Sequence, residues 1–214
     1  MLPDLYRGGE VPRYLGFDEV RKLVDAALLI EWRIVYHGER NQLLLEALWQ
    51  TGHRVSEIVG GPRQVKGKVV GHYRGLRSCD IDAREIALKL QVQKGQASSD
   101  SRIQEHMVRI EPSLLTRLVA YYHEQKIDYQ GRIFPLTKEM VEAIFKRVVD
   151  IAGLPSWVHP HTLRHSHAMY LIGQGVPLHI VMEALGHRQV RSTLVYARPT
   201  DRHTAEYKAN IRMS

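Results

Sequence analysis

The sequence predicts a mainly α-helical (α+β) domain that carries one small antiparallel β-sheet. Over most of the 214 residues, apolar side chains recur three and four positions apart, the spacing that places them on one face of a helix. Residues 84–93 instead alternate, with Ile86, Leu88, Leu90 and Val92 on one face of an extended strand. A hydrophobic content of 44% with 25% charged residues is typical of a globular protein that buries a full core.

The N-terminal part of the chain begins with residues 1–16, which contain Pro and Gly and predict an irregular arm. A helix is expected from Phe17, because Phe17, Val20, Leu23, Val24 and Ala27 follow helical spacing. A second, mostly apolar helix is expected over residues 39–50. Residues 60–77 hold five glycines, five basic residues and no acid, which predicts a loop.

The rest of the chain predicts one β-hairpin followed by helices. The strand over residues 84–93 ends in the polar stretch KGQASSDSR, which begins at Lys94, and His106 starts the returning strand. Helices are expected over residues 113–125, 137–153, 161–173, 177–185 and 192–197. Thr137 is a suitable N-cap and Gly153 a suitable stop. We expect one domain over residues 17–198 and a polar tail over residues 199–214.

Charge and cysteine content narrow the class of partner and the compartment. Thirty Lys and Arg face twenty-three Asp and Glu, a net charge of +7, which favours nucleic acid as a partner and an acidic membrane surface second. The single cysteine, Cys79, excludes an intramolecular disulfide and suits a reducing cytosol. No apolar run approaches the ~20 residues of a membrane span. We therefore expect a cytoplasmic protein without a membrane partner.

The basic stretch over residues 60–77 has two interpretations of equal weight. Charge runs usually form a solvated surface. The absence of acids equally favours a loop that contacts phosphates, so these side chains are candidate DNA-binding residues: Arg63, Lys66, Lys68, Arg74 and Arg77.

The stretch HTLRHSH, residues 161–167, is a candidate chemical site. In a helix, His161, Arg164 and His165 share one face. A zinc site is disfavoured, because Thr162 stands where an H-E-x-x-H motif has its glutamate and Arg164 would repel a dication. The guanidinium instead matches phosphate or carboxylate oxygens in a bidentate manner.

Two further stretches carry candidate residues. TGHRVSEI places Arg54 and Glu57 three apart, either as an ordinary helix ion pair or as a carboxylate that fixes a second guanidinium. LGHRQVRSTLVYARP contains His187 and, nine residues later, Tyr196. Taken alone, a tyrosine is more often structural than catalytic.

As a set, these residues resemble the catalytic signature of the tyrosine recombinases, the lambda integrase and Xer family. The resemblance covers essentially the whole chain: YLGFDEVRKLV, TGHRVSEI, HPHTLRHSHAMYLIGQG and LGHR with its following Tyr are all similar to family motifs. The run HPHTLRHS together with LGHR is especially similar to the fimbrial phase-variation invertases, which are short members of this family.

The resemblance implies site-specific DNA recombination without metal, ATP or another cofactor. Tyr196 would attack a phosphodiester and form a 3′-phosphotyrosine with a free 5′-hydroxyl. Arg54 and Arg164 would stabilise the phosphorane charge, and Lys94 would protonate the leaving 5′-oxygen.

The family also implies roles for the neighbouring residues and an assembly. His161 would receive or relay the tyrosine proton, His187 would bond the phosphate, and Glu57 and His165 would support the site. The implied partners are double-stranded DNA carrying a recombination site, further copies of the chain in a tetramer on two sites, and an accessory DNA-bending protein. The tail over residues 199–214 would dock on the neighbouring protomer.

Departures from the family pattern leave alternatives open. His53 stands in place of the usual apolar residue, and Lys89 is the alternative to Lys94, because the hairpin tip lacks the family's second lysine and arginine cluster. Too few residues precede Phe17 for the family's core-binding domain, so we expect an invertase-like short form or a catalytic fragment. Competing functions are a type IB topoisomerase, a non-catalytic DNA-binding regulator and, remotely, a metal-dependent hydrolase.

Overall fold

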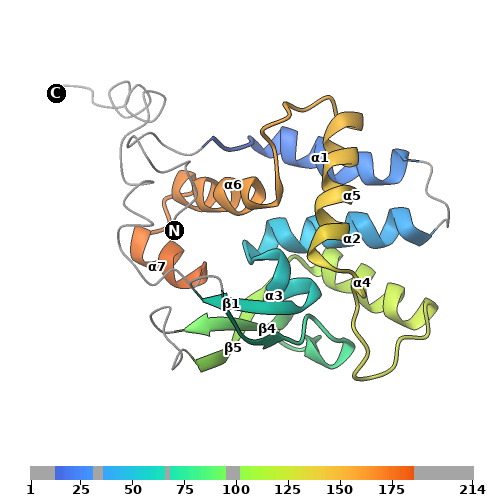
Figure 1. Ribbon diagram of the computed structural model, residues 1–214. Helices are drawn as coiled ribbons and strands as arrows, with labels where there is room; N and C mark the ends of the chain where they lie inside the picture. Colours follow the sequence, from blue (N-terminus) through green and yellow to red (C-terminus); the bar gives the residue numbers. More distant parts are fainter. Residues whose placement is uncertain (1–12, 31–35, 66–67, 95–101, 186–214) are drawn as a thin grey trace.

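The computed structural model describes residues 13–30, 36–65, 68–94 and 102–185. In this part of the chain, helices and two antiparallel sheets pack around one main core (Figure 1). The helices are α1 (Phe17–Leu29), α2 (Tyr36–Thr51), α3 (Val55–Val59), the 3-10 turn η2 (Ser78–Asp80), α4 (Pro112–Glu124), α5 (Lys138–Ile151), α6 (Pro160–Gly173) and α7 (Leu178–Ala184). The strands are β1 (Gly61–Val65), β2 (Lys68–Tyr73), β3 (Ile81–Asp82), β4 (Ala87–Lys94) and β5 (Arg102–Arg109). The predicted mainly helical class is confirmed.

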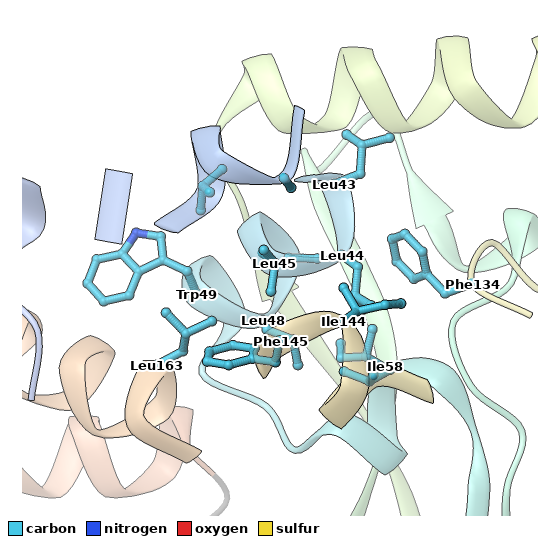
Figure 2. Close-up of a cluster of buried hydrophobic side chains, with 14 of the residues drawn as sticks. Leu43, Leu44, Leu45, Leu48, Trp49, Ile58, Phe134, Ile144, Phe145 and Leu163 are labelled. Atoms are coloured by element: carbon cyan, nitrogen blue, oxygen red, sulfur yellow. The ribbon is translucent and has the colours of Figure 1, made fainter. Parts of the chain in front are cut away.

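Helix α2 lies at the centre of the helical layer. In Figure 1, α1, α5 and α6 lie around it on one side of the molecule, and the strands lie on the other. In its run LLLEALW, residues 43–49, every side chain except that of Glu46 is buried, as expected for a helix with neighbours on all sides. Figure 2 shows this core, where α2 meets side chains of α3, α5 and α6: the labelled residues are Leu43, Leu44, Leu45, Leu48, Trp49, Ile58, Phe134, Ile144, Phe145 and Leu163.

The helix boundaries follow local chemistry. Thr137 caps α5 as predicted, since its hydroxyl accepts a hydrogen bond from the Met140 backbone N–H at 3.3 Å. Helices α4 and α6 each begin at a proline, Pro112 and Pro160, one residue before the predicted start. A proline suits the first helical position because its missing N–H has no intrahelical partner there.

The predicted β-hairpin is the main part of a three-stranded sheet of order β3-β4-β5. Strands β4 and β5 pair in antiparallel register from Ala87 opposite Arg109 to Lys94 opposite Arg102. Leu88 and Leu90 turn inward and are fully buried in the main core. Strand β4 runs through Lys94, one residue further than predicted, and β5 begins at Arg102, four residues before the predicted start at His106.

The expectation of a loop over residues 60–77 is wrong for most of its length. Residues 61–65 and 68–73 form a second antiparallel pair, β1-β2, with a register shift between Arg63 and Gln64. The glycines that suggested a loop instead permit a close backbone crossing at the base of this hairpin. Gly75 has φ +74°, and a Cβ there would lie 2.7 Å from the Gly60 nitrogen. Only glycine fits this position without strain.

The last part of the predicted arm packs against α6. Leu15 is buried, and its backbone N–H donates to the Ser166 hydroxyl at 2.8 Å. Tyr14 lies against a small second apolar cluster of α6 and α7 that includes Met169 and Leu185. The predicted helix over residues 192–197 and the tail over residues 199–214 lie outside the described residues. In the part of the chain that is described, no helix is long and apolar enough to cross a bilayer.

Candidate active site

Arg54 is positioned by the junction between α2 and α3. Helix α2 ends at Thr51, Gly52 turns the chain with φ +63°, and Arg54 is the N-cap residue of α3. This places the guanidinium of Arg54 at the start of a short helix, with 40% of the side chain exposed. An arginine in this position remains able to reach an external anion.

Glu57 holds Arg54 in position through two hydrogen bonds. One carboxylate oxygen accepts the backbone N–H of Arg54 at 2.9 Å, and the other accepts its guanidinium at 2.9 Å. Burial alone would raise the pKa of the Glu57 carboxyl, but the charges of Arg54, His53 and Arg164 outweigh it and lower that pKa. Glu57 is therefore an anion inside the protein, and it sets both the helix cap and the pose of Arg54.

Arg164 lies in α6 and is 4% exposed. Its guanidinium donates to the carbonyl of Gly52 at 2.9 Å and to the carbonyl of Leu185 at 2.5 Å. The first carbonyl lies two residues before Arg54, within the TGHRVSEI motif, and the second belongs to the LGHR motif that follows α7. Arg164 thus joins the three sequence motifs at one place.

The absence of a side chain at Gly52 lets His167 of α6 and Leu185 pack closely against the α2-α3 junction. A Cβ at this position would lie 2.6 Å from Cδ2 of His167 and 2.7 Å from Cδ2 of Leu185. His167 is itself buried, and its ring meets Trp49 edge-on with centroids 5.8 Å apart. His167 therefore packs against the end of α2.

His161 lies in the first turn of α6, near enough for the charges of Arg164 and Arg54 to act on its ring. The surrounding protein shields the ring from water, which lowers the pKa of His161 to about 4, and the positive charges of Arg164 and Arg54 lower it further. His165, one turn on, is buried, and burial together with His161 lowers its pKa to about 4. Both rings are neutral near pH 7, and a neutral imidazole can accept a proton.

The register of β4 separates the two candidate lysines. Lys89 lies on the face opposite to the buried Leu88 and Leu90, and its Nζ is 3.8 Å from Glu105 of β5. Lys94 is the last residue of β4, opposite Arg102 of β5, five residues further along the same strand than Lys89.

The basic residues of the 60–77 segment fall into different environments. Arg63 is buried and donates to the Val70 carbonyl at 3.2 Å, and Arg74 pairs with Asp80 at 2.6 Å and with Glu105 at 3.3 Å. Arg77 is half-buried and pairs its backbone with Arg132 in an isolated bridge. Lys68 is exposed on β2, whereas Lys66 lies outside the described residues.

His187 and Tyr196 also lie outside the described residues, so the described part of the site consists of Arg54, Glu57, His161 and Arg164. Two guanidiniums can bind a phosphodiester, and a neutral imidazole can accept a proton. Where the structure is described, no three or more His, Cys, Asp or Glu side chains gather as a metal-ligand set.

Two histidines near this site have no role in the sequence prediction, His53 and His106. Their rings lie 5.6 Å apart, between the α2-α3 junction and β5. The departure at His53 from the family's apolar residue was the one clue in the sequence. His106 gave none, since a single histidine in a predicted strand is unremarkable.

Known proteins share both the sequence pattern and the fold. The family model described as "Phage integrase family" matches residues 70–203. The tyrosine recombinase XerD of Corynebacterium glutamicum is 28% identical over 208 residues, covering 90% of this chain and 59% of its own length. The XerH site-specific recombinase, in a structure described as a pre-cleavage complex with its difH substrate, aligns with a TM-score of 0.67 at 22% identity, covering 94% of this chain and 55% of that one. The catalytic domain of bacteriophage HP1 integrase aligns with a TM-score of 0.57 at 20% identity, covering 92% and 94%.

The arginine cluster, the fold and the family match define a catalytic domain of the tyrosine recombinase type. The chain belongs to the phage integrase family. It spans 59% of the length of the XerD relative, and almost the full length of the HP1 catalytic domain.

Proposed function

We propose that this protein is a site-specific DNA recombinase that cuts and rejoins DNA through a covalent 3′-phosphotyrosine, without metal or ATP. The observation that carries the proposal is the convergence of two arginines on one junction. The Glu57 carboxylate pairs with the Arg54 guanidinium, while Arg164 donates a hydrogen bond to the carbonyl of Gly52, two residues before Arg54. Guanidiniums preorganised in this way can stabilise the charge that develops on a pentacoordinate phosphorus.

The remaining roles follow the order of bond changes. The Tyr196 oxygen attacks phosphorus as its proton passes to neutral His161, which accepts or relays it. The bond from phosphorus to the 5′-oxygen then breaks, and the ammonium of Lys94 supplies the proton that this oxygen needs. His187 hydrogen-bonds the phosphate, and the buried His165 supports His161 from the next turn. The phosphotyrosine conserves the bond energy, so a 5′-hydroxyl can reverse the reaction.

The proposed partner is double-stranded DNA carrying a recombination site, in the cytoplasm at the nucleoid. The net charge of +7 and the exposed Lys68 support binding to a polyanion. We propose that the protein acts as a tetramer on two DNA sites, with residues 199–214 docking on the neighbouring protomer. An accessory DNA-bending protein would bring the two sites together.

Covalent trapping on a nicked duplex tests the chemistry. The duplex is selected for binding to the protein from a randomised library, nicked so that the cut end is lost, and incubated in EDTA. Wild-type protein should shift on a denaturing gel as a covalent adduct, and Tyr196→Phe should not. An adduct that needs added divalent metal, or one that persists in Tyr196→Phe, would contradict the proposal.

A second assay separates recombination from the topoisomerase alternative. Two selected sites on one supercoiled plasmid should yield recombinant products, with relaxation of a plasmid that carries one site as a minor reaction. Rapid relaxation without recombinants would favour a topoisomerase, and specific binding without any adduct would favour a regulator.

A further inference from the structure

His53 presents a buried imidazole nitrogen without a described partner. The residue is 2% exposed, and its Nδ1 lies 2.9 Å from the Thr51 carbonyl. Because a carbonyl can only accept, Nδ1 carries the proton, and Nε2 of the neutral ring is left as an acceptor. Among the described residues, no donor reaches this Nε2. A buried acceptor in this state is unfavourable unless something pairs with it.

His106, whose ring contacts that of His53, also has a nitrogen without a described hydrogen-bond partner. It lies in β5 opposite Leu90, and its Nδ1 is likewise buried without a hydrogen-bond partner in the described part of the chain. The two rings are 5.6 Å apart between centroids and inclined by 33°. This separation is within the range of ring contacts, and the two unpaired nitrogens suit a hydrogen-bonded bridge through one water.

The contact joins two parts of the site that are far apart in sequence. His53 immediately precedes Arg54, whose pose Glu57 fixes, whereas His106 belongs to the hairpin whose other strand ends at Lys94. The backbone register pairs His106 with Leu90, four residues before Lys94 on β4. A bond between the rings therefore restrains the β4-β5 hairpin relative to the arginine cluster.

We propose that His53 and His106 are positioning residues that hold the Lys94 hairpin in register with Arg54. His106 Nδ1–H donates to one bridging water, which donates to His53 Nε2, and this bridge sets the position of the hairpin whose strand β4 ends at Lys94. The inference rests on the proposed function, in which Lys94 protonates the leaving 5′-oxygen. It also gives a role to the histidine that replaces the family's apolar residue.

The experiment compares two leaving groups in the nicked-duplex assay. One duplex has the natural 5′-oxygen at the cut, and the other has a bridging 5′-sulfur, whose thiolate leaves without a proton from an acid. The variants are His106→Leu, which removes the ring nitrogens, and His106→Asn, whose amide can stand near the position of Nδ1. Met107→Leu is the matched control, since Met107 is the next residue of β5, on the exposed opposite face.

Misplacing a catalytic group can cost on the order of 10²-fold in rate, so His106→Leu should slow cleavage of the oxygen duplex by about 10-fold to 100-fold. It should cleave the sulfur duplex at close to the wild-type rate, with unchanged DNA affinity. His106→Asn should recover much of the loss, and Met107→Leu should cleave both duplexes normally. A merely structural defect would slow both duplexes alike.

Lys94→Ala separates failure of this inference from failure of the proposed function. If the sulfur duplex rescues Lys94→Ala but not His106→Leu, or if His106→Leu cleaves the oxygen duplex at the wild-type rate, the positioning role is overturned. If sulfur does not rescue Lys94→Ala, the assignment of the general acid fails. If wild type forms no adduct on either duplex, the proposed chemistry itself fails. His106→Asn keeps the test decisive if the leucine variant does not fold.

Discussion

The carboxylate of Glu57 binds Arg54 twice, at 2.9 Å through the backbone N–H and at 2.9 Å through the guanidinium. One buried side chain thus both begins α3 and aims the arginine. The ion pair that the sequence suggested at this spacing is confirmed. Its position at a helix start explains why the three-residue step occurs here, because an N3 glutamate reaches back to its own N-cap residue.

Replacing Glu57 with Gln should uncouple these two tasks. The amide oxygen can still accept one N–H, but the charge that fixes the guanidinium is lost. Because Arg54 is 40% exposed, solvent screens the pair, and we expect a loss of only about 1–2 kcal/mol in the free energy of unfolding. Covalent cleavage should fall more steeply, on the order of 10-fold to 100-fold.

Urea denaturation and single-turnover cleavage measure the two effects separately. Glu85→Gln is the matched control, since it breaks an exposed pair with Arg109 at 3.4 Å and should leave stability and cleavage almost unchanged. Wild-type cleavage by Glu57→Gln would show that Arg54 needs no fixed pose.

Arg164→Lys should damage the site although it keeps the charge. A lysine has one ammonium in place of the planar fork that bonds the carbonyls of both Gly52 and Leu185. We expect cleavage to fall by about 10²-fold to 10³-fold. Leaving one buried carbonyl unpaired should also lower the free energy of unfolding by about 1–3 kcal/mol. Arg109→Lys, in the exposed pair with Glu85, is the control for the same chemical change. Equal cleavage by the two variants would contradict the anchoring role of Arg164.

Gly52→Ala should be strongly destabilising for a steric reason. The new Cβ would lie 2.6 Å from His167 and 2.7 Å from Leu185, in a backbone with φ +63°. Gly153 is a matched control, because its φ is +64° and a Cβ there meets nothing within 4 Å. Both alanine variants carry a backbone cost of about 1 kcal/mol, and only Gly52→Ala adds an overpacking cost of about 1–3 kcal/mol. Equal urea midpoints for the two variants would rule out the close approach.

The sequence predicted the helical class, the β4-β5 hairpin and the meeting of Arg54 with Glu57, because periodicity and spacing act over a few residues. It did not predict the β1-β2 hairpin, since its glycines look like a loop until their close backbone crossing is seen. The anchoring of Arg164 on Gly52 was equally out of reach. It joins residues 112 positions apart, and no local pattern encodes such a contact.

Acid should weaken the fold through its buried histidines. Burial lowers the pKa of His53 to about 4 against Glu57 and the Thr51 carbonyl, which raise it, while Arg164 and His106 lower it further. Burial likewise lowers the pKa of His167 to about 4, with His53 and Arg164 adding to the effect. Between pH 6.5 and 4 the unfolded chain therefore binds more protons than the folded one.

The sign follows directly from this difference. Stability should be fully present above about pH 6.5 and should decline as the pH falls towards 4, by up to about 3 kcal/mol for each of these histidines. Urea midpoints at pH 7.5, 6.0 and 5.0 measure this decline. His53→Leu removes one of the titrating rings and should show a shallower decline. An identical pH dependence in the variant would show that His53 is not a source of the effect.

The basic residues around β2 should divide into DNA-binding and structural members. Lys68 is exposed on β2, so Lys68→Ala should weaken binding to all duplexes alike and reduce the slope of log affinity against log salt by about 1. Arg74 instead bonds the buried Asp80 at 2.6 Å, so Arg74→Ala should lower the free energy of unfolding by about 1–3 kcal/mol. Its salt slope should be unchanged, because its charge is already neutralised inside the protein. Binding titrations between 50 mM and 200 mM salt, the range over which phosphate contacts change affinity most visibly, resolve the two cases. A lowered slope for Arg74→Ala with unchanged stability would instead place Arg74 on the DNA.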